Sequence, residues 1–171
     1  MVVVYLRHSN DEIPSGEEPT YKHDQHINKD GRKLVKSFAK KFIHEFGHPQ
    51  IVYYSPFNRG RETMKGLKKY FNKNVRYLVD PRLSRFFTPQ EKKECDISKK
   101  TKKHEPPISE SRKQFHKRVY EQADDMIKYL STGLVLCITH AVVLKRVAHR
   151  FKIKLPEHYE FLEYFSLSSK K

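Results

Sequence analysis

The sequence predicts an α/β fold built on a mainly parallel sheet. Short apolar runs suited to buried strands alternate with longer segments whose apolar residues recur every three or four positions, the period of an amphipathic helix. Strands that alternate with helices indicate βαβ units, which place helices on the faces of a parallel sheet. With 171 residues and no internal repeat, the chain is expected to form one domain over residues 1–171.

The first predicted strand lies at the amino terminus, where an apolar run with three valines stops at Arg7 and His8. Such a run suits a strand buried on both faces, although periodicity alone leaves a buried helix open. As a parallel strand it would present Arg7 and His8 at its carboxyl end, where open α/β sheets bind their ligands. The strand end therefore predicts an anion-binding site. A long polar loop follows, from Ser9 to about Asn28.

A helix is predicted over residues 30–46, with Asn28 or Asp30 as its cap and Gly47 just beyond its end. Its apolar residues fall on one face and its lysines on the other, which indicates one buried and one solvated side. β-branched and aromatic residues predict two further strands, and a shorter apolar stripe between them predicts a helix. These elements are a strand at 50–54, a helix at 59–71 and a strand at 75–79.

The segment at about 84–108 differs in kind from its neighbours. Phe86 and Phe87 are followed by six lysines and then by Pro106 and Pro107. We interpret it as a basic excursion from the sheet that lies over the site, with a solvated charge run as the plain alternative. Regular elements then return: a helix at 109–130, a strand at 134–139, a helix at 142–151 and an edge strand at 159–165.

The composition indicates anionic partners without choosing among them. Lys and Arg number 35 against 20 Asp and Glu, giving a net charge of +15 and a pI near 9.8. Such a field attracts phosphorylated small molecules, phosphoproteins, nucleic acid or an acidic membrane surface. Two cysteines, Cys95 and Cys137, are too few for a disulfide framework and indicate a reducing compartment, with Cys137 in the core. With no transmembrane stretch or signal peptide, a cytoplasmic location and no membrane partner are expected.

Three predicted strands end in residues suited to phosphate chemistry. They end in Arg7 and His8, in the segment 55–59 that closes with Arg59, and in His140. Carboxyl ends of parallel strands share one edge of a sheet, so these side chains could meet in one pocket. Arginine forks bind phosphate oxygens bidentately, and histidine can attack phosphorus or stabilise the charge that develops. The sequence therefore favours phosphoryl transfer, and no metal-spaced ligand cluster is visible.

Six segments resemble motifs of the histidine phosphatase superfamily, also called the phosphoglycerate mutase-like family, in the order of that family. Residues 54–63 resemble its Ser-Pro-x-x-Arg-Ala-x-Gln-Thr motif, and residues 138–141 its second-histidine strand. Each match is loose, but together they span the chain from Val2 to about Arg150 and are fairly specific. The segments are VVYLRHS at 3–9, INKDGR at 27–32, YSPFNRGRET at 54–63, DPRL at 80–83, ESRKQFHKRV at 110–119 and ITHA at 138–141.

The resemblance implies a three-layer α/β/α sandwich and a phosphomonoester hydrolase that needs no cofactor and no metal. His8 would become phosphohistidine, Arg7 and Arg59 would hold the phosphoryl group, and His140 would stabilise its charge. Ser9 stands where the family has glycine, so we also expect Ser9 to line the substrate site.

The chain departs from the family where the general acid is expected. The family's Leu-x-Glu appears here as residues 83–85, with Arg85 in the place of the acid. Arginine cannot release a proton at working pH, so Asp11, Glu12 or Glu91 would have to serve, or the leaving group needs little help. The alternative is a weakly active or inactive phosphate-binding member that acts as a scaffold or sensor. Its basic surface could also bind nucleic acid or an acidic protein. The physiological substrate and the oligomeric state stay open.

Overall fold

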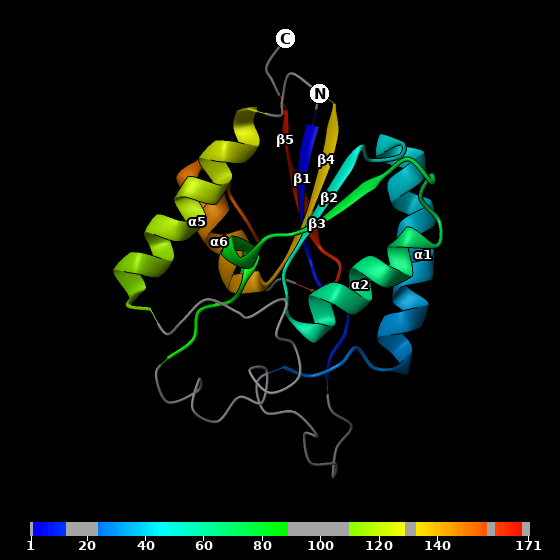
Figure 1. Ribbon diagram of the computed structural model, residues 1–171, viewed down its shortest axis with the longest axis horizontal. Helices are drawn as coiled ribbons and strands as arrows, with labels where there is room; N and C mark the ends of the chain where they lie inside the picture. The colour runs from blue at the N-terminus through cyan, green and yellow to red at the C-terminus, as the bar shows by residue number, and fades with distance from the viewer. Residues whose placement is uncertain (1, 13–23, 89–109, 129–132, 157–159, 169–171) are drawn as a thin grey trace.

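The computed structural model of the chain describes residues 2–12, 24–88, 110–128, 133–156 and 160–168. A five-stranded sheet in the order β3-β2-β4-β1-β5 forms its centre (Figure 1). The strands β1 to β4 are parallel to their neighbours, and β5 runs antiparallel to β1 at the edge. The strands are β1 (Val2–Arg7), β2 (Ile51–Tyr54), β3 (Arg76–Val79), β4 (Leu134–Thr139) and β5 (Tyr164–Ser168).

Helices cover both faces of the sheet, so the predicted three-layer α/β/α arrangement with a mainly parallel sheet is confirmed. The helices α1 and α2 lie on one face and α5 and α6 on the other (Figure 1). A short 3-10 turn, η1, follows β3. The helices are α1 (Lys29–Phe46), α2 (Asn58–Lys68), α5 (Arg112–Ile127) and α6 (Ala141–Arg150), and η1 spans Pro81–Leu83.

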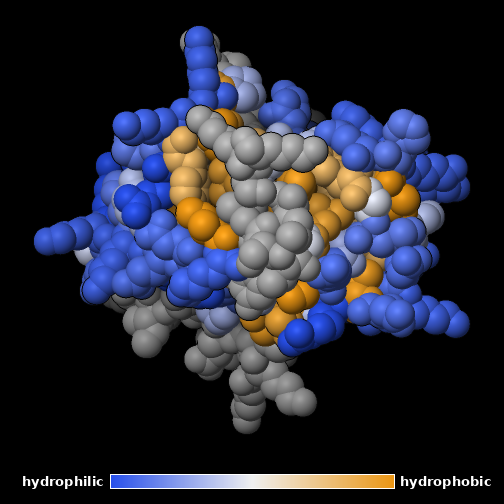
Figure 2. Space-filling model, turned by 90° about the horizontal axis from the view of Figure 1, so that it is seen from above, coloured by the Kyte–Doolittle hydropathy of each residue, from blue (hydrophilic) through white to orange (hydrophobic). Residues whose placement is uncertain are grey.

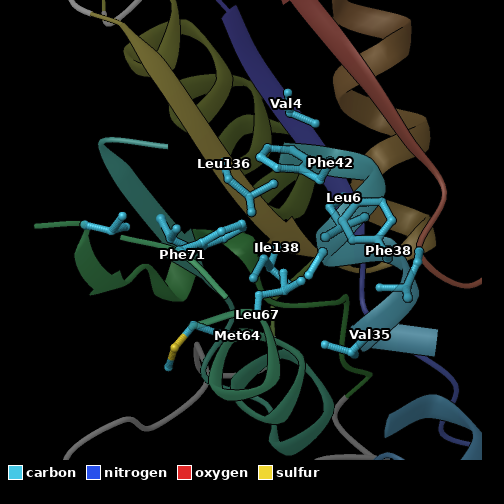
Figure 3. Packing of buried hydrophobic residues seen from close by; sticks show 14 of the residues in the cluster. Val4, Leu6, Val35, Phe38, Phe42, Met64, Leu67, Phe71, Leu136 and Ile138 are labelled. Atoms are coloured by element: carbon cyan, nitrogen blue, oxygen red, sulfur yellow. The ribbon is translucent and has the colours of Figure 1, made fainter. Parts of the chain in front are cut away.

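The alternating faces of β1 and β4 explain why their sequences are apolar throughout. Successive side chains of a strand point to opposite faces. Val4 and Leu6 of β1 pack against α1 and α2, in the cluster shown in Figure 3. Val3 and Tyr5 pack in the opposite cluster, against α5 and α6, and all four are fully buried. Both faces of the strand are therefore core, as a run without polar interruption predicts.

Local signals fix where the helices begin. The Asn28 side chain accepts a hydrogen bond from the N–H of Gly31 at 2.7 Å and so caps α1 as predicted. Ser111 and Gln114 form a reciprocal capping box at the start of α5. The helix α2 ends at Lys68, three residues before the predicted end, because the N–H of Lys69 bonds to the carbonyl of Gly66 and tightens the last turn.

The predicted closing strand is wrong in its position. The observed strand β5 begins at Tyr164, whereas residues 161 and 162 form a turn. Leu162 has φ of 59°, a left-handed conformation that interrupts an extended chain. Phe161 in this turn packs against Arg7 instead of joining the sheet.

Polar side chains cover most of the face of the molecule that Figure 2 shows. Figure 2 looks onto the edge of the sheet at which β1 begins, and hydrophilic residues surround the hydrophobic ones that show between them. In the described part of the chain, none of the helices is long and apolar enough to cross a membrane. Cys137 is a buried core residue, as predicted. The basic excursion from residue 89 onward, including Cys95 and Glu91, lies outside the described residues.

Candidate active site

The register of the sheet brings the predicted strand ends together. Arg7 is level with Thr139 of β4, and Tyr54 of β2 is level with Ile138. The residues that follow, His8 and His140, therefore leave the sheet side by side. The N–H of His8 still bonds to the carbonyl of Thr139 at 2.9 Å. The imidazole rings of His8 and His140 lie with centroids 5.1 Å apart at an interplanar angle of 61°.

His8 is held as a neutral imidazole with one nitrogen left to act. Its Nδ1 lies 2.8 Å from the carbonyl oxygen of Ser9, which can only accept, so Nδ1 carries the proton and Nε2 carries the lone pair. The ring is 5 % exposed. Burial lowers the pKa of His8 well below its ordinary 6.5, and the neighbouring charge of Arg59 lowers it further. His8 is thus available as a nucleophile near neutral pH.

His140 is held in the opposite tautomer. The Nε of Arg59 can only donate and lies 3.3 Å from Nδ1 of His140, so Nδ1 is the acceptor and Nε2 carries the proton. Nε2 then donates to the hydroxyl oxygen of Ser55 at 2.8 Å. Burial, followed by the charge of Arg59, lowers the pKa of His140 well below 6.5. This leaves one N–H on His140 that could turn to an anion.

Arg59 connects this histidine to the carboxylate of Asp11. It is the second residue of α2, 5 % exposed, and its Nη1 lies 3.1 Å from Asp11 Oδ2 and 3.1 Å from Gln25 Oε1. Burial lowers the pKa of Arg59, and the charge of Asp11 opposes that shift. Asp11 is also 3.9 Å from Nδ1 of His8, so a single carboxylate lies near both groups.

Arg7 approaches the site over an aromatic ring. Its guanidinium carbon lies 4.0 Å from the ring centroid of Phe161, a cation–π distance. The same ring lies 6.0 Å from the imidazole of His8. The N–H of Arg7 bonds to the carbonyl of Glu163, so the turn before β5 is fixed to the end of β1. The sequence reasoning missed Phe161, because only the antiparallel edge strand brings it here.

The contacts of Ser9 do not support its predicted role in binding substrate. Its hydroxyl donates to the carbonyl of Gly31 at 2.7 Å, and its N–H donates to Thr63 Oγ1 at 2.9 Å. Both of its donors are used inside the protein, and the residue is fully buried. Gly31 is required beside it, since a Cβ there would collide with the backbone of Asn10. Ser9 therefore anchors the loop that carries Asp11.

The comparison with protein families agrees with this geometry. Residues 3–168 match the model of the histidine phosphatase superfamily, branch 1. The chain belongs to the histidine phosphatase superfamily. No curated protein matches it significantly.

Solved structures of histidine phosphatase fold resemble the chain at low sequence identity, which shows the fold alone. The mycobacterial glucosyl-3-phosphoglycerate phosphatase complexed with VO3 has a TM-score of 0.69 at 15% identity, covering 98% of this chain and 90% of that one. The ecdysone phosphate phosphatase from Bombix mori with tungstate gives 0.64 at 16% identity over 98% and 89%. The protein histidine phosphatase SixA with tungstate gives 0.57 at 16% identity over 86% and 75%.

At the place of the superfamily's acid, this member carries Arg85 on a braced turn. Arg85 lies 5.1 Å over the ring of Phe87 and donates to the carbonyl of Phe86. Its charge contributes to lowering the pKa values of both histidines, so it lies within electrostatic reach of the site. The preceding turn is fixed by Thr139, whose hydroxyl donates to the carbonyl of Leu83 at 2.6 Å. The site of this superfamily member is thus more cationic than the family motif.

Asp11 is the described carboxyl best placed to supply a proton. Its side chain is 18% exposed and lies between His8 and Arg59. Burial raises the pKa of Asp11, although Arg59 and Arg7 oppose the shift. Of the other two candidates, Glu12 is exposed and Glu91 lies outside the described residues. In those residues no cluster of three or more His, Cys, Asp or Glu side chains could hold a metal ion.

A second buried carboxylate, Asp24, was not identified from the sequence. Its Oδ1 accepts from the N–H of Asn58 at 2.7 Å, so it caps α2 from a separate loop and supports Arg59. Burial raises the pKa of Asp24 from 3.8 to about 6. The folded state therefore holds a proton that the unfolded chain releases, and stability falls as pH rises from near 4 to above 6.

Replacing Asp24 by asparagine should remove this pH dependence. The amide keeps an acceptor for Asn58 but does not titrate. Between roughly pH 4.5 and 7.5 the wild type should lose about 2 kcal/mol of unfolding free energy relative to Asp24→Asn. Urea unfolding of both proteins across this pH range measures the difference. A constant difference would show that the Asp24 carboxyl titrates normally.

Proposed function

We propose that the protein is a phosphatase that hydrolyses a phosphomonoester through a phosphohistidine on His8. The observation that carries the proposal is the fixed tautomer of His8: the Ser9 carbonyl holds Nδ1–H, which leaves the Nε2 lone pair beside His140 and Arg59. A buried, neutral imidazole next to two arginines suits attack on an anionic phosphoryl group.

In the first step Nε2 of His8 attacks phosphorus, a P–N bond forms and the P–O bond to the leaving group breaks. Arg7 and Arg59 bind the phosphoryl oxygens, and the Nε2–H of His140 turns from Ser55 to stabilise their charge. In the second step water attacks phosphorus and the P–N bond breaks, which frees phosphate and restores His8.

Asp11 acts on the leaving group in this scheme. As a carboxylic acid it gives its proton to the departing oxygen, and as a carboxylate it accepts a proton from the attacking water. Its raised pKa and its contact with Arg59, which would bind the phosphoryl group, support this role. Substrate phosphate would also displace Asp11 from Arg59, because both anions use the same guanidinium.

Comparing an aryl with an alkyl phosphate tests the function and the acid together. The wild type should release phosphate from both esters, whereas Asp11→Asn should release phosphate from the alkyl ester about a hundredfold more slowly or worse. The rate of aryl ester hydrolysis should fall much less, since the aryl leaving group departs without a proton. Glu12→Gln, one residue further along the same loop, is the matched control and should behave as wild type. Equal losses on both esters would assign Asp11 to positioning Arg59.

Failure to release phosphate from either ester, with vanadate or tungstate still bound, would overturn the proposed function. It would favour the alternative of a phosphate-binding member without turnover.

Arg85 favours a second substrate class, phosphoramidates such as phosphohistidine. An imidazole leaving group that is already protonated needs no further proton from an acid. An arginine in the acid's place would therefore not slow this reaction. A structural neighbour, SixA, is a protein histidine phosphatase. Faster turnover of phosphorylated imidazole than of the aryl ester by both wild type and Asp11→Asn would favour this class.

A further inference from the structure

A cationic pocket lies between α5 and α6, outside the histidine site. Its volume is about 380 Å³, within the range of roughly 300–1,000 Å³ common for ligand sites. Among the described residues that line it, none is acidic and five of the eight are basic or histidine. The lining residues are Phe86, Arg112, Phe115, His116, Val142, Lys145, Arg146 and His149.

Three cationic side chains of this pocket do not stabilise the fold through contacts of their own. Within the part of the chain that the structure describes, the side chains of Arg112, Lys145 and Arg146 make no hydrogen bond or ion pair. Arg112 is the first residue of α5, where the helix dipole disfavours a positive charge. An anionic ligand would compensate for all three charges.

The floor of the pocket is apolar and offers no fully exposed phenylalanine ring for a base to stack on, since Phe115 is buried and Phe86 is half-buried. Phe115 is 4% exposed, and its ring packs against Phe86 with centroids 5.6 Å apart. Val142 is 46% exposed, so an aliphatic surface is what the pocket offers to a ligand. Binding of single-stranded nucleic acid relies on open aromatic faces. The pocket therefore fits an aliphatic group flanked by anions better than it fits a nucleobase.

Two residues that line the pocket lie close along the chain to residues of the candidate active site. Val142 follows His140 by two residues at the start of α6, and Phe86 is adjacent to Arg85. The helices α5 and α6 lie side by side on this face of the sheet (Figure 1). The charge of Arg85 and the charge of the pocket have the same sign.

We propose that this pocket binds an acidic segment of a phosphoprotein substrate, with an aliphatic side chain against Val142 and carboxylates on Arg112, Lys145 and Arg146. This inference rests on the proposed phosphatase function and gives it a substrate class. Carboxylates that approach such exposed cations gain modest energy each, so the preference comes from several contacts together.

Two phosphoserine peptides of equal length test the pocket. One carries Glu, Asp and Leu within a few residues of the phosphoserine, and the other has Gln and Asn in place of the acids. The wild type should prefer the acidic peptide by about tenfold in kcat/KM, mainly through KM, and the preference should weaken with salt. In the double variant Lys145→Gln, Arg146→Gln the ratio should fall to near one. Arg150→Gln on the same helix should keep the ratio, since Arg150 pairs with Asp124 and does not line the pocket.

A direct binding measurement separates this inference from the proposed function. Fluorescence anisotropy of a labelled, unphosphorylated acidic peptide should show binding that Lys145→Gln, Arg146→Gln weakens severalfold, even if neither peptide is hydrolysed. If the wild type shows no preference for the acidic peptide, or if the double variant keeps that preference, the proposed role of the pocket is wrong. The proposed phosphatase function would be unaffected. Tighter binding of an oligonucleotide than of the acidic peptide, lost in the double variant, would overturn the assignment to a protein partner.

Discussion

Replacing His8 by alanine is expected to lower phosphate release from an aryl phosphate on the order of a thousandfold or more. The imidazole is the group that forms the P–N bond, and the remaining arginines and His140 can bind phosphate but cannot form a covalent intermediate. Rapid alkaline quench of the wild type with a phosphorylated substrate should give a label that is stable to alkali and is lost in acid. The variant should give none, because formation of the label and release of phosphate both require the imidazole of His8.

The His8→Ala result needs a control for folding, because His8 is buried against His140 and Phe161. His8→Asn keeps a polar group that can donate to the Ser9 carbonyl, so it separates loss of the nucleophile from loss of packing. His44→Ala, an exposed histidine in the last turn of α1, should retain full activity. Wild-type turnover by a folded His8→Asn protein would exclude phosphohistidine at this position.

The strands that carry the site could be predicted because their environment is simple. The strands β1 and β4 are buried on both faces, so their sequences are unbroken apolar runs. Each run stops where the polar edge of the sheet begins. Convergence of His8 and His140 then follows from parallel pairing, which places Arg7 level with Thr139. The predicted edge strand begins too early in the sequence. The apolar residues of this segment first form a turn under Arg7 and then pair with β1, and their periodicity does not distinguish the two.

The residues that tune the site could not be predicted, because they act through long-range contacts. Asp24 supports α2 across 34 residues of sequence, and Gln25 reaches Arg59 in the same way. Both come from a polar loop whose composition carries no positional signal. The sequence predicts that Ser9, at the family's glycine position, lines the substrate site, whereas its hydroxyl donates to the carbonyl of the distant Gly31.

Replacing Arg59 by lysine is expected to lower kcat/KM about a hundredfold while keeping the charge. The guanidinium holds its polar partners in fixed directions, with Nε on His140 and Nη1 on Asp11 and Gln25, and a phosphoryl group would need the same fork. An ammonium is a point charge that cannot hold a phosphate bidentately and also orient an imidazole. Steady-state kinetics with the aryl phosphate, together with inhibition by vanadate, measures both losses.

The size of the Arg59→Lys effect distinguishes geometry from charge. Arg61→Lys, two residues further along α2, is the matched control, because Arg61 is half-buried on the same helix yet forms none of these contacts. It should keep near wild-type kinetics. If charge alone held the phosphoryl group, Arg59→Lys would also remain near wild type and vanadate would bind it equally well. That outcome would remove Arg59 from transition-state binding and leave Arg7 and Arg85 as the cations that hold the substrate.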